Sequence, residues 1–176
     1  MNIQRLSTFH AAEYRALMLE AYELHADAFT SSYSERVALP LSWWESRLEP
    51  VAEPFELVLG AFHESRIAGV AGLSFESREK ARHKATLFGM YVPSRYRRLG
   101  FAYQLVRAVL SEAKSHPSVK LVQLTVTHGN RGAQLLYEQS GFVEFGLEPY
   151  AVAVGEAYVS KVHMWCDIRG LGGVQA

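Results

Sequence analysis

Residues 90–102 have the sequence Met-Tyr-Val-Pro-Ser-Arg-Tyr-Arg-Arg-Leu-Gly-Phe-Ala. This pattern predicts the end of a strand, a basic turn that contains Gly100, and the start of a helix. The first backbone N–H groups of a helix have no partner inside the helix, and they lie at the positive end of its dipole. Phosphate groups bind at such places. Because Arg97 and Arg98 add positive charge to the turn, the stretch predicts a binding site for a diphosphate.

The composition indicates an ordinary globular domain. Of the 176 residues, 49% are hydrophobic and 20% are charged, so the chain can bury a core, and we expect a single domain over residues 1–176. The formal net charge is zero, which argues against nucleic acid or a membrane as a partner. The single cysteine, Cys166, cannot form an internal disulfide. No Cys/His spacing is typical of a metal site, so we expect no metal.

Two further absences in the sequence bear on location. No apolar run approaches the ~20 residues of a membrane span. The first residues lack the apolar segment of a signal peptide. We therefore expect a cytoplasmic protein.

Hydrophobic periodicity and turn residues predict a definite order of elements. The expected elements are a strand at 2–7, helices from Thr8 to about Phe29 and at 40–48, strands at 55–63, 66–76 and 83–92, a helix at 99–115, a strand at 119–127, a helix at 131–140, and strands at 142–154 and 157–168. Residues 30–39 are expected to form a polar connection. Hairpins next to crossover helices predict an α/β (α+β) fold, with a mixed, mostly antiparallel central sheet and helices on both faces.

Three residues carry specific backbone predictions. Gly89, near the end of the strand at 83–92, predicts a β-bulge or a close backbone approach. Asn130 is expected to cap the N-terminus of the helix at 131–140, and Gly141 to follow its C-terminus.

Two motifs carry a resemblance to a known family. The first is Arg97-x-x-Gly100-x-Ala102, which follows a strand that ends in Met-Tyr-Val-Pro. The second is residues 130–142, Asn-Arg-Gly-Ala-Gln-Leu-Leu-Tyr-Glu-Gln-Ser-Gly-Phe. They are similar to the Gln/Arg-x-x-Gly-x-Gly/Ala and Asn-x-x-Ala-x-x-Leu-Tyr-x-x-x-Gly-Phe motifs of the GNAT superfamily of N-acetyltransferases. The resemblance covers nearly the whole chain, but residues 1–50 match only in the order of elements.

The resemblance implies a single GNAT domain that transfers an acetyl group from acetyl-coenzyme A directly to a primary amine. In this family the basic turn holds the diphosphate of the cofactor, and the preceding strand end pairs with the pantetheine arm. The residues implied to bind the cofactor are Met90, Tyr91, Val92, Arg97, Arg98, Leu99, Gly100, Phe101, Ala102 and Asn130. The backbone N–H of Tyr91 or Val92 is the implied donor to the carbonyl oxygen of the thioester.

Tyr137 resembles the general acid of the family, which protonates the departing thiolate. A phenol with a pKa of ~10 can give a proton to a thiolate in a dry pocket. Tyr137 also lies on the apolar side of its helix with Ala133 and Leu136, so a core position explains it as well.

The general base stays open. An amine of pKa ~10.4 must lose a proton before it attacks, and some GNAT branches place a glutamate on the strand that corresponds to 83–92. This chain has no carboxylate there. The remaining candidates are Glu76, Glu79, His83, His128 and a chain of water molecules.

The acceptor also stays open. Aromatic residues that could line its pocket, or belong to the core instead, are Phe29, Tyr33, Trp43, Trp44, Tyr150 and Tyr158. The expected partner is a small-molecule or peptide amine, which includes antibiotics, polyamines and protein N-termini or lysines. By resemblance we also expect a homodimer through the last strands. The alternative function is an acyl-coenzyme A sensor or partner module that binds the cofactor without catalysis.

Overall fold

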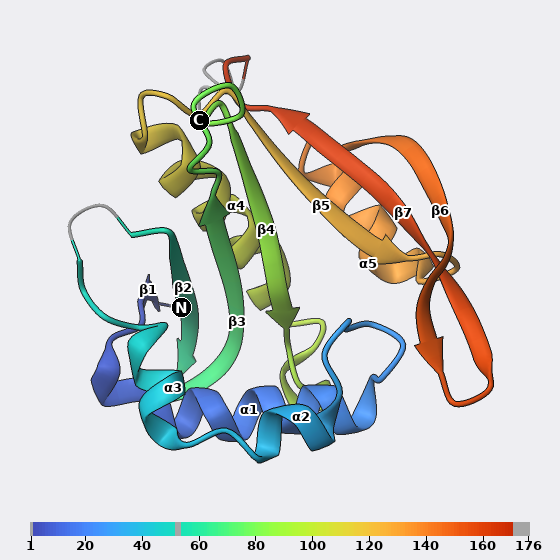
Figure 1. Cartoon of the computed structure of the whole chain (residues 1–176). Coiled ribbons are helices and arrows are strands. Elements are labelled where there is room, and N and C mark those ends of the chain that lie inside the picture. The colour runs from blue at the N-terminus through green and yellow to red at the C-terminus, as the bar shows by residue number, and fades with distance from the viewer. Residues whose placement is uncertain (1, 52–53, 171–176) are drawn as a thin grey trace.

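A seven-stranded sheet forms the centre of the protein in the computed structural model, which describes residues 2–51 and 54–170 (Figure 1). The strands are β1 (Asn2–Arg5), β2 (Glu56–His63), β3 (Arg66–Phe75), β4 (Lys84–Tyr91), β5 (Leu121–Thr127), β6 (Val143–Val154) and β7 (Ala157–Asp167). Their order across the sheet is β1-β2-β3-β4-β5-β7-β6. Among the strands of these described ranges, only β4 and β5 pair in parallel, and all other neighbours are antiparallel. The prediction of a mixed, mostly antiparallel sheet is therefore confirmed.

Helices cover both faces of this sheet (Figure 1). They are α1 (Ala11–Leu24), α2 (Tyr33–Val37), α3 (Leu41–Ser46), α4 (Phe101–Ser115) and α5 (Arg131–Gln139), with single 3-10 turns η1 (Thr8–His10) and η2 (Ser94–Tyr96). We call the side covered by α1 and α3 the α1 face, and the side covered by α4 and α5 the α4 face. Within the described ranges, no helix has both the length and the apolar character needed to cross a membrane.

Side chains along the strands alternate between two separate hydrophobic cores, one on each face of the sheet. Successive side chains of a strand point to opposite faces. In β2, Leu57 and Leu59 accordingly join the core under α4, whereas Val58 joins the core under α1. The sheet therefore has no solvent-exposed face in its first half, which explains why β2 and β3 are apolar along almost their whole length.

The region between α1 and α3 differs from the sequence prediction. The first helix ends at Leu24 and not near Phe29, because His25 leaves the helical conformation with φ −137° and ψ 54°. Residues 30–39 contain α2, which was not predicted. Ser32 Oγ accepts a hydrogen bond from the Glu35 N–H at 3.2 Å, and the Glu35 carboxylate accepts one from the Ser32 N–H at 2.8 Å. This capping box, Ser-x-x-Glu, is what starts the short helix.

The sheet opens between β4 and β5. Their parallel pairing includes only residues 84–86 of β4 and 121–123 of β5, and beyond this point the two strands diverge (Figure 1). The β3–β4 register shifts at Gly89, so that Ala71 lies opposite both Gly89 and Met90. Gly89 has φ +58°. The predicted β-bulge is confirmed, and bulges bend the strand that carries them.

Candidate active site

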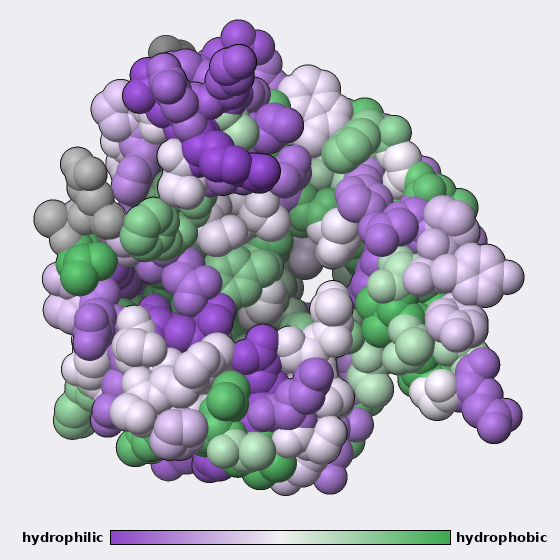
Figure 2. Space-filling model, in the orientation of Figure 1, coloured by the Kyte–Doolittle hydropathy of each residue, from purple (hydrophilic) through white to green (hydrophobic). Residues whose placement is uncertain are grey.

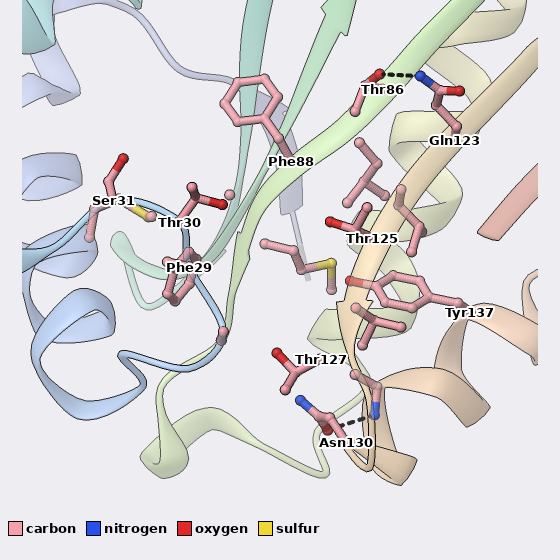
Figure 3. A pocket seen from close by; sticks show the side chains of 18 of the residues that line it. Phe29, Thr30, Ser31, Thr86, Phe88, Gln123, Thr125, Thr127, Asn130 and Tyr137 are labelled. Atoms are coloured by element: carbon pink, nitrogen blue, oxygen red, sulfur yellow. Dashed lines mark hydrogen bonds between the residues drawn. The ribbon is translucent and has the colours of Figure 1, made fainter. Parts of the chain in front are cut away.

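A pocket of about 440 Å³ lies where β4 and β5 diverge. This volume is typical of a site for a small molecule. Figure 2 shows that the surface is hollowed between the part of the molecule built on β1–β4 and the part built on β6 and β7. At the closed end of the opening, Gln123 Nε2 donates a hydrogen bond to Thr86 Oγ1 at 3.2 Å (Figure 3).

Both faces of the sheet contribute to the pocket. Along β5, Leu124 and Val126 belong to the core under α4, so Thr125 and Thr127 point toward the α1 face. Side chains from α5, including Tyr137, line the pocket together with side chains from α1 and α2. The opening therefore passes through the sheet from the α4 face to the α1 face.

Tyr137 reaches the pocket from the α4 face. Its side chain is buried, and its hydroxyl end points into the opening (Figure 3). Burial raises the pKa of Tyr137 to about 12, so the phenol is protonated at neutral pH. The hydroxyl makes no hydrogen bond to any residue in the described ranges. The structure thus brings a free proton donor to the point where the strands part.

Asn130 and Met90 line the same pocket. Asn130 Oδ1 accepts a hydrogen bond from the Ala133 N–H at 3.2 Å, which confirms Asn130 as the N-cap of α5. Gly141 has φ +94° directly after this helix, as a C′ glycine requires. Met90 lies in the bulge of β4 and packs against the core under α4.

The turn that follows β4 has the geometry of an anion site. Arg98 and Gly100 have φ +62° and +83°, and α4 begins at Phe101, two residues later than predicted. In the part of the chain that the structure describes, the N–H groups of residues 98–102 have no acceptor. Successive free amides in such a turn form a concave anion-binding nest. The Arg97 side chain ties this turn to the preceding strand end, because its Nε donates a hydrogen bond to the Val92 carbonyl oxygen at 3.1 Å.

Side chains around the turn are anchored away from it. Phe101 is buried, and Ala102 packs against the core under α4. The Tyr91 hydroxyl donates to Glu20 Oε1 at 3.0 Å, and burial raises the pKa of Tyr91 to about 12. Val92 is buried and Leu99 is exposed. Neither Tyr91 nor Val92 lines the pocket, and both side chains are engaged within the protein.

Comparison with known proteins identifies the family. Residues 18–142 match the family model described as Acetyltransferase (GNAT) family. The chain belongs to this family. The resemblance found in the two sequence motifs is thus confirmed.

Solved structures show the same GNAT fold. The acetyltransferase of the GNAT family from Streptococcus pneumoniae is 25% identical, with a TM-score of 0.81 over 93% of this chain and 97% of that chain. The structure of yncA from Salmonella typhimurium with its cofactor acetyl-CoA is 17% identical, with a TM-score of 0.78 over 100% of this chain and 98% of that chain. Ribosomal-protein-alanine N-acetyltransferase from Brucella melitensis is 21% identical, with a TM-score of 0.77 over 95% of this chain and 99% of that chain. A search of curated proteins gives no significant match.

The four residues that were candidates for the base of this GNAT protein lie outside the pocket, which leaves water among the options that the sequence leaves open. None of Glu76, Glu79, His83 and His128 lines it. Glu76 binds Arg78, and their hydrogen bonds lower the pKa of Glu76 to about 2, which makes it a very weak base. His128 is exposed in the turn after β5.

Most of the predicted acceptor aromatics are also elsewhere. Phe29 lines the pocket, but Tyr33, Trp43 and Trp44 do not. Trp44 is completely buried and packs edge-on against Tyr14, with ring centroids 5.6 Å apart. It is a core residue, as the alternative interpretation held. The remaining aromatic candidates are Tyr150 and Tyr158, which are exposed in the β6–β7 hairpin. Their ring centroids lie 5.1 Å apart, and the ring planes are tilted by 60°.

Sequence reasoning missed a histidine–glutamate pair on the α1 face of this GNAT site. His163 lines the pocket, and its Nε2 lies 2.7 Å from Glu148 Oε2. An ionised carboxylate only accepts hydrogen bonds, so Nε2 carries a proton, and in the neutral form of the ring Nδ1 keeps the free lone pair. The signal in the sequence was that His163 alternates with Val162 and Met164, both buried. This signal did not point to the pocket, because the sequence does not reveal that β7 lies beside β5.

Lys161 was missed as well. It is one of the few buried charged residues, and burial lowers its pKa. Its Nζ donates to the carbonyl oxygens of Asp27 and Ala28 at 3.0 and 2.9 Å, and lies 2.9 Å from Thr127 Oγ1. These contacts fix the segment after α1, which then crosses the pocket at residues 28–31.

Proposed function

We propose that this protein is an N-acetyltransferase that moves an acetyl group from acetyl-coenzyme A directly to a primary amine. The observation that carries the proposal is the opening through the sheet between β4 and β5, with the Tyr137 hydroxyl inside it (Figure 3). Membership of the GNAT acetyltransferase family supports it. The amine and the residue roles below are our proposals.

The nest of amides at residues 98–102 is proposed to hold the diphosphate of coenzyme A. Free N–H groups at the start of α4 and the charges of Arg97 and Arg98 favour an anion there. The pantetheine arm then runs into the opening past Met90 and Asn130. When bound, the cofactor supplies a thioester whose carbonyl carbon accepts the amine.

The backbone N–H of Tyr91 or Val92 is proposed to donate to the carbonyl oxygen, on which negative charge develops. Tyr137 gives a proton to the leaving sulfur from the α4 face. Its pKa of about 12 keeps that proton available. The same dry surroundings raise the basicity of the leaving thiolate, because desolvation disfavours its charge too.

His163 is proposed to accept the proton of the amine on the α1 face. Nδ1 is the atom with the free lone pair, because Nε2 donates to Glu148. Acid and base then lie on opposite faces of the sheet, and the reacting carbon lies between them. Such a division keeps the proton that is removed apart from the proton that is delivered.

The test is calorimetric titration with acetyl-coenzyme A, followed by measurement of free thiol with a panel of amines. Binding together with thiol release would support the proposal. Binding with no thiol release for any amine would favour a sensor that has lost catalysis. A protein that does not bind acetyl-coenzyme A would contradict both functions.

A further inference from the structure

The α1-face half of the pocket carries an excess of positive charge. Two guanidinium groups, Arg36 and Arg47, line the pocket, and no Asp or Glu of the described ranges does. Both arginines make a cation–π contact with the same aromatic ring, that of Trp43. Their central carbons lie 4.6 and 4.8 Å from the centroid of the Trp43 ring.

Arg47 already has an anionic partner. Its Nη2 lies 3.1 Å from both carboxylate oxygens of Glu56, and both side chains are largely screened from solvent. Arg47 also lies over the Phe88 ring at 5.5 Å. Its charge is therefore compensated within the protein.

Among the described residues, Arg36 has no such anionic partner. Its Nη2 donates to Ser31 Oγ at 2.6 Å, and the guanidinium lies near enough to the Tyr22 hydroxyl to offset part of the rise that burial causes in the pKa of Tyr22. Within the same part of the chain, Arg36 Nε is buried without a hydrogen-bond partner. The neighbouring carboxylate, Glu35, is held by the N-cap Ser32. A half-buried guanidinium with unused donors and no counter-ion is costly unless a ligand supplies the acceptor.

We propose that Arg36 binds a carboxylate of the acceptor, so that the acceptor is an amine that also carries a carboxylate, such as a free amino acid. This inference rests on the proposed N-acetyltransferase function and narrows its substrate. A guanidinium presents paired donors that match the two oxygens of a carboxylate. The same positive charge disfavours polyamines and other acceptors whose remaining groups are cationic.

The first experiment compares amino acids with their decarboxylated twins. The pairs are phenylalanine with 2-phenylethylamine, methionine with 3-(methylthio)propylamine, and lysine with 1,5-pentanediamine. Binding to the protein in the presence of coenzyme A is followed by tryptophan fluorescence, because Trp43 contacts Arg36. We expect the amino acid of at least one pair to bind about 10- to 100-fold more tightly, the range for a hydrogen-bonded charge. Equal or tighter binding of the twin in every pair, or no binding by any amino acid, would overturn the inference.

Variants assign the effect to Arg36. Arg36→Gln should remove the preference for the amino acid, and Arg36→Lys should restore part of it. Arg15→Gln is the matched control. Arg15 also has a buried, unpartnered Nε and holds α2 through the Val37 carbonyl oxygen at 3.0 Å, but it does not line the pocket. An equal loss of preference in Arg15→Gln would mean that Arg36 acts by holding α2 in place, and the inference would be wrong.

Two further arms separate the remaining possibilities. β-Alanine and 2-aminoethylphosphonate differ in their anionic group, and tighter binding of the phosphonate would overturn the carboxylate assignment. Thiol release from acetyl-coenzyme A is measured with every amine of the panel. The decarboxylated twins could cause thiol release while the amino acids bind no more tightly than the twins. That result would support the N-acetyltransferase function and would contradict only the inference that Arg36 binds a carboxylate.

Discussion

Lys161 Nζ lies 3.0 Å from the backbone carbonyl oxygen of Asp27, although 134 residues separate the two in the chain. The contact joins the last hairpin of the protein to the segment that follows its first helix. The segment enters the pocket directly afterwards, at Ala28. Lys161 Nζ and the Thr127 hydroxyl, which donates to the same Asp27 carbonyl oxygen at 2.8 Å, therefore hold the segment that shapes the α1-face half of the pocket.

Lys161→Met should loosen this segment. It removes the donor to the Ala28 carbonyl oxygen and one of the two donors to the Asp27 carbonyl oxygen, which keeps Thr127 Oγ1 at 2.8 Å, at a total cost of about 1–3 kcal/mol. We expect lower stability in urea and a higher KM for the amine, while the affinity for acetyl-coenzyme A stays near that of the parent protein. Lys120→Met is the control, because Lys120 Nζ binds only the exposed Pro117 carbonyl oxygen. A KM that does not respond to Lys161→Met would show that the segment needs no such anchor.

Gly100→Glu should abolish or strongly weaken the binding of acetyl-coenzyme A. The φ of +83° at Gly100 strains any other residue, and the new carboxylate would repel a diphosphate at the start of α4. We expect a loss of tenfold or more, at least about 1.4 kcal/mol, in calorimetric titration. Gly155→Glu places the same side chain at φ +62° in the β6–β7 turn, with nothing within 4 Å of the added carbon, and should bind normally. Unchanged affinity in Gly100→Glu would remove the diphosphate assignment.

Tyr137→Phe should slow turnover and spare cofactor affinity. The change removes only a hydroxyl that has no partner in the described part of the chain, so the packing of the ring against Phe142 remains. Loss of a general acid costs about 10²- to 10⁴-fold in rate. The measurement is kcat from thiol release, with calorimetric affinity as the internal control. Tyr158→Phe, which alters an exposed phenol outside the pocket, serves as the comparison. Full turnover in Tyr137→Phe would rule out the acid role.

Much of the backbone geometry on the side proposed to hold the cofactor was predictable, because its residues are close together in sequence. The turn at 97–102, the Asn130 cap and the Gly89 bulge all follow from local backbone chemistry and required no knowledge of the sheet order. The family, the sheet type and the placement of helices on both faces were predicted from the same two segments and the order of elements. Boundaries were wrong mainly after Leu24, where contacts with distant strands end the helix.

The acceptor side could not be predicted, since its residues meet only in the folded protein. Arg36, His163 and Lys161 come from α2 and β7, and nothing near them in sequence marks them as neighbours. The choice among the four candidate bases and water could not be narrowed for the same reason, because the distance of each residue from the opening depends on how β4 and β5 part. The homodimer and the identity of the amine stay predictions.

His163→Gln should reduce kcat/KM, because it removes the proposed base. The expected loss is about 10²- to 10⁴-fold, and added imidazole should restore part of it by occupying the vacated space. Glu148→Gln should have a smaller effect, since it removes the partner that orients the ring and leaves the ring in place. Rates are measured at saturating acetyl-coenzyme A. If kcat/KM of His163→Gln equals that of the parent protein, His163 is not the base, and a chain of water molecules becomes the favoured proton acceptor.

The protein should lose stability above pH 10. Burial raises the pKa of Tyr14 and of Tyr137 to about 12 in the folded protein, compared with ~10 for a tyrosine in the unfolded chain. The folded state therefore holds these protons more tightly, and the resulting stability is complete below pH 10 and is lost as the pH rises from 10 toward 12. Urea unfolding at pH 8, 10 and 11 measures the decline. The double change of Tyr14→Phe and Tyr137→Phe should make the decline shallower, while the contribution of Tyr91, whose pKa is also raised to about 12, remains. An equally steep decline in that variant would assign the effect to other groups.

The pocket is lined from both faces of the sheet. On the proposed assignment, the donor occupies the side built by residues 90–142, and the acceptor occupies the side built by the first helices and the last hairpin. The two substrates would then occupy different parts of the pocket, and a ternary complex could form in either order of addition. The two halves can also diverge separately. Changes at Arg36 or in the segment held by Lys161 can alter which amine is accepted while the handling of the acyl donor is inherited unchanged.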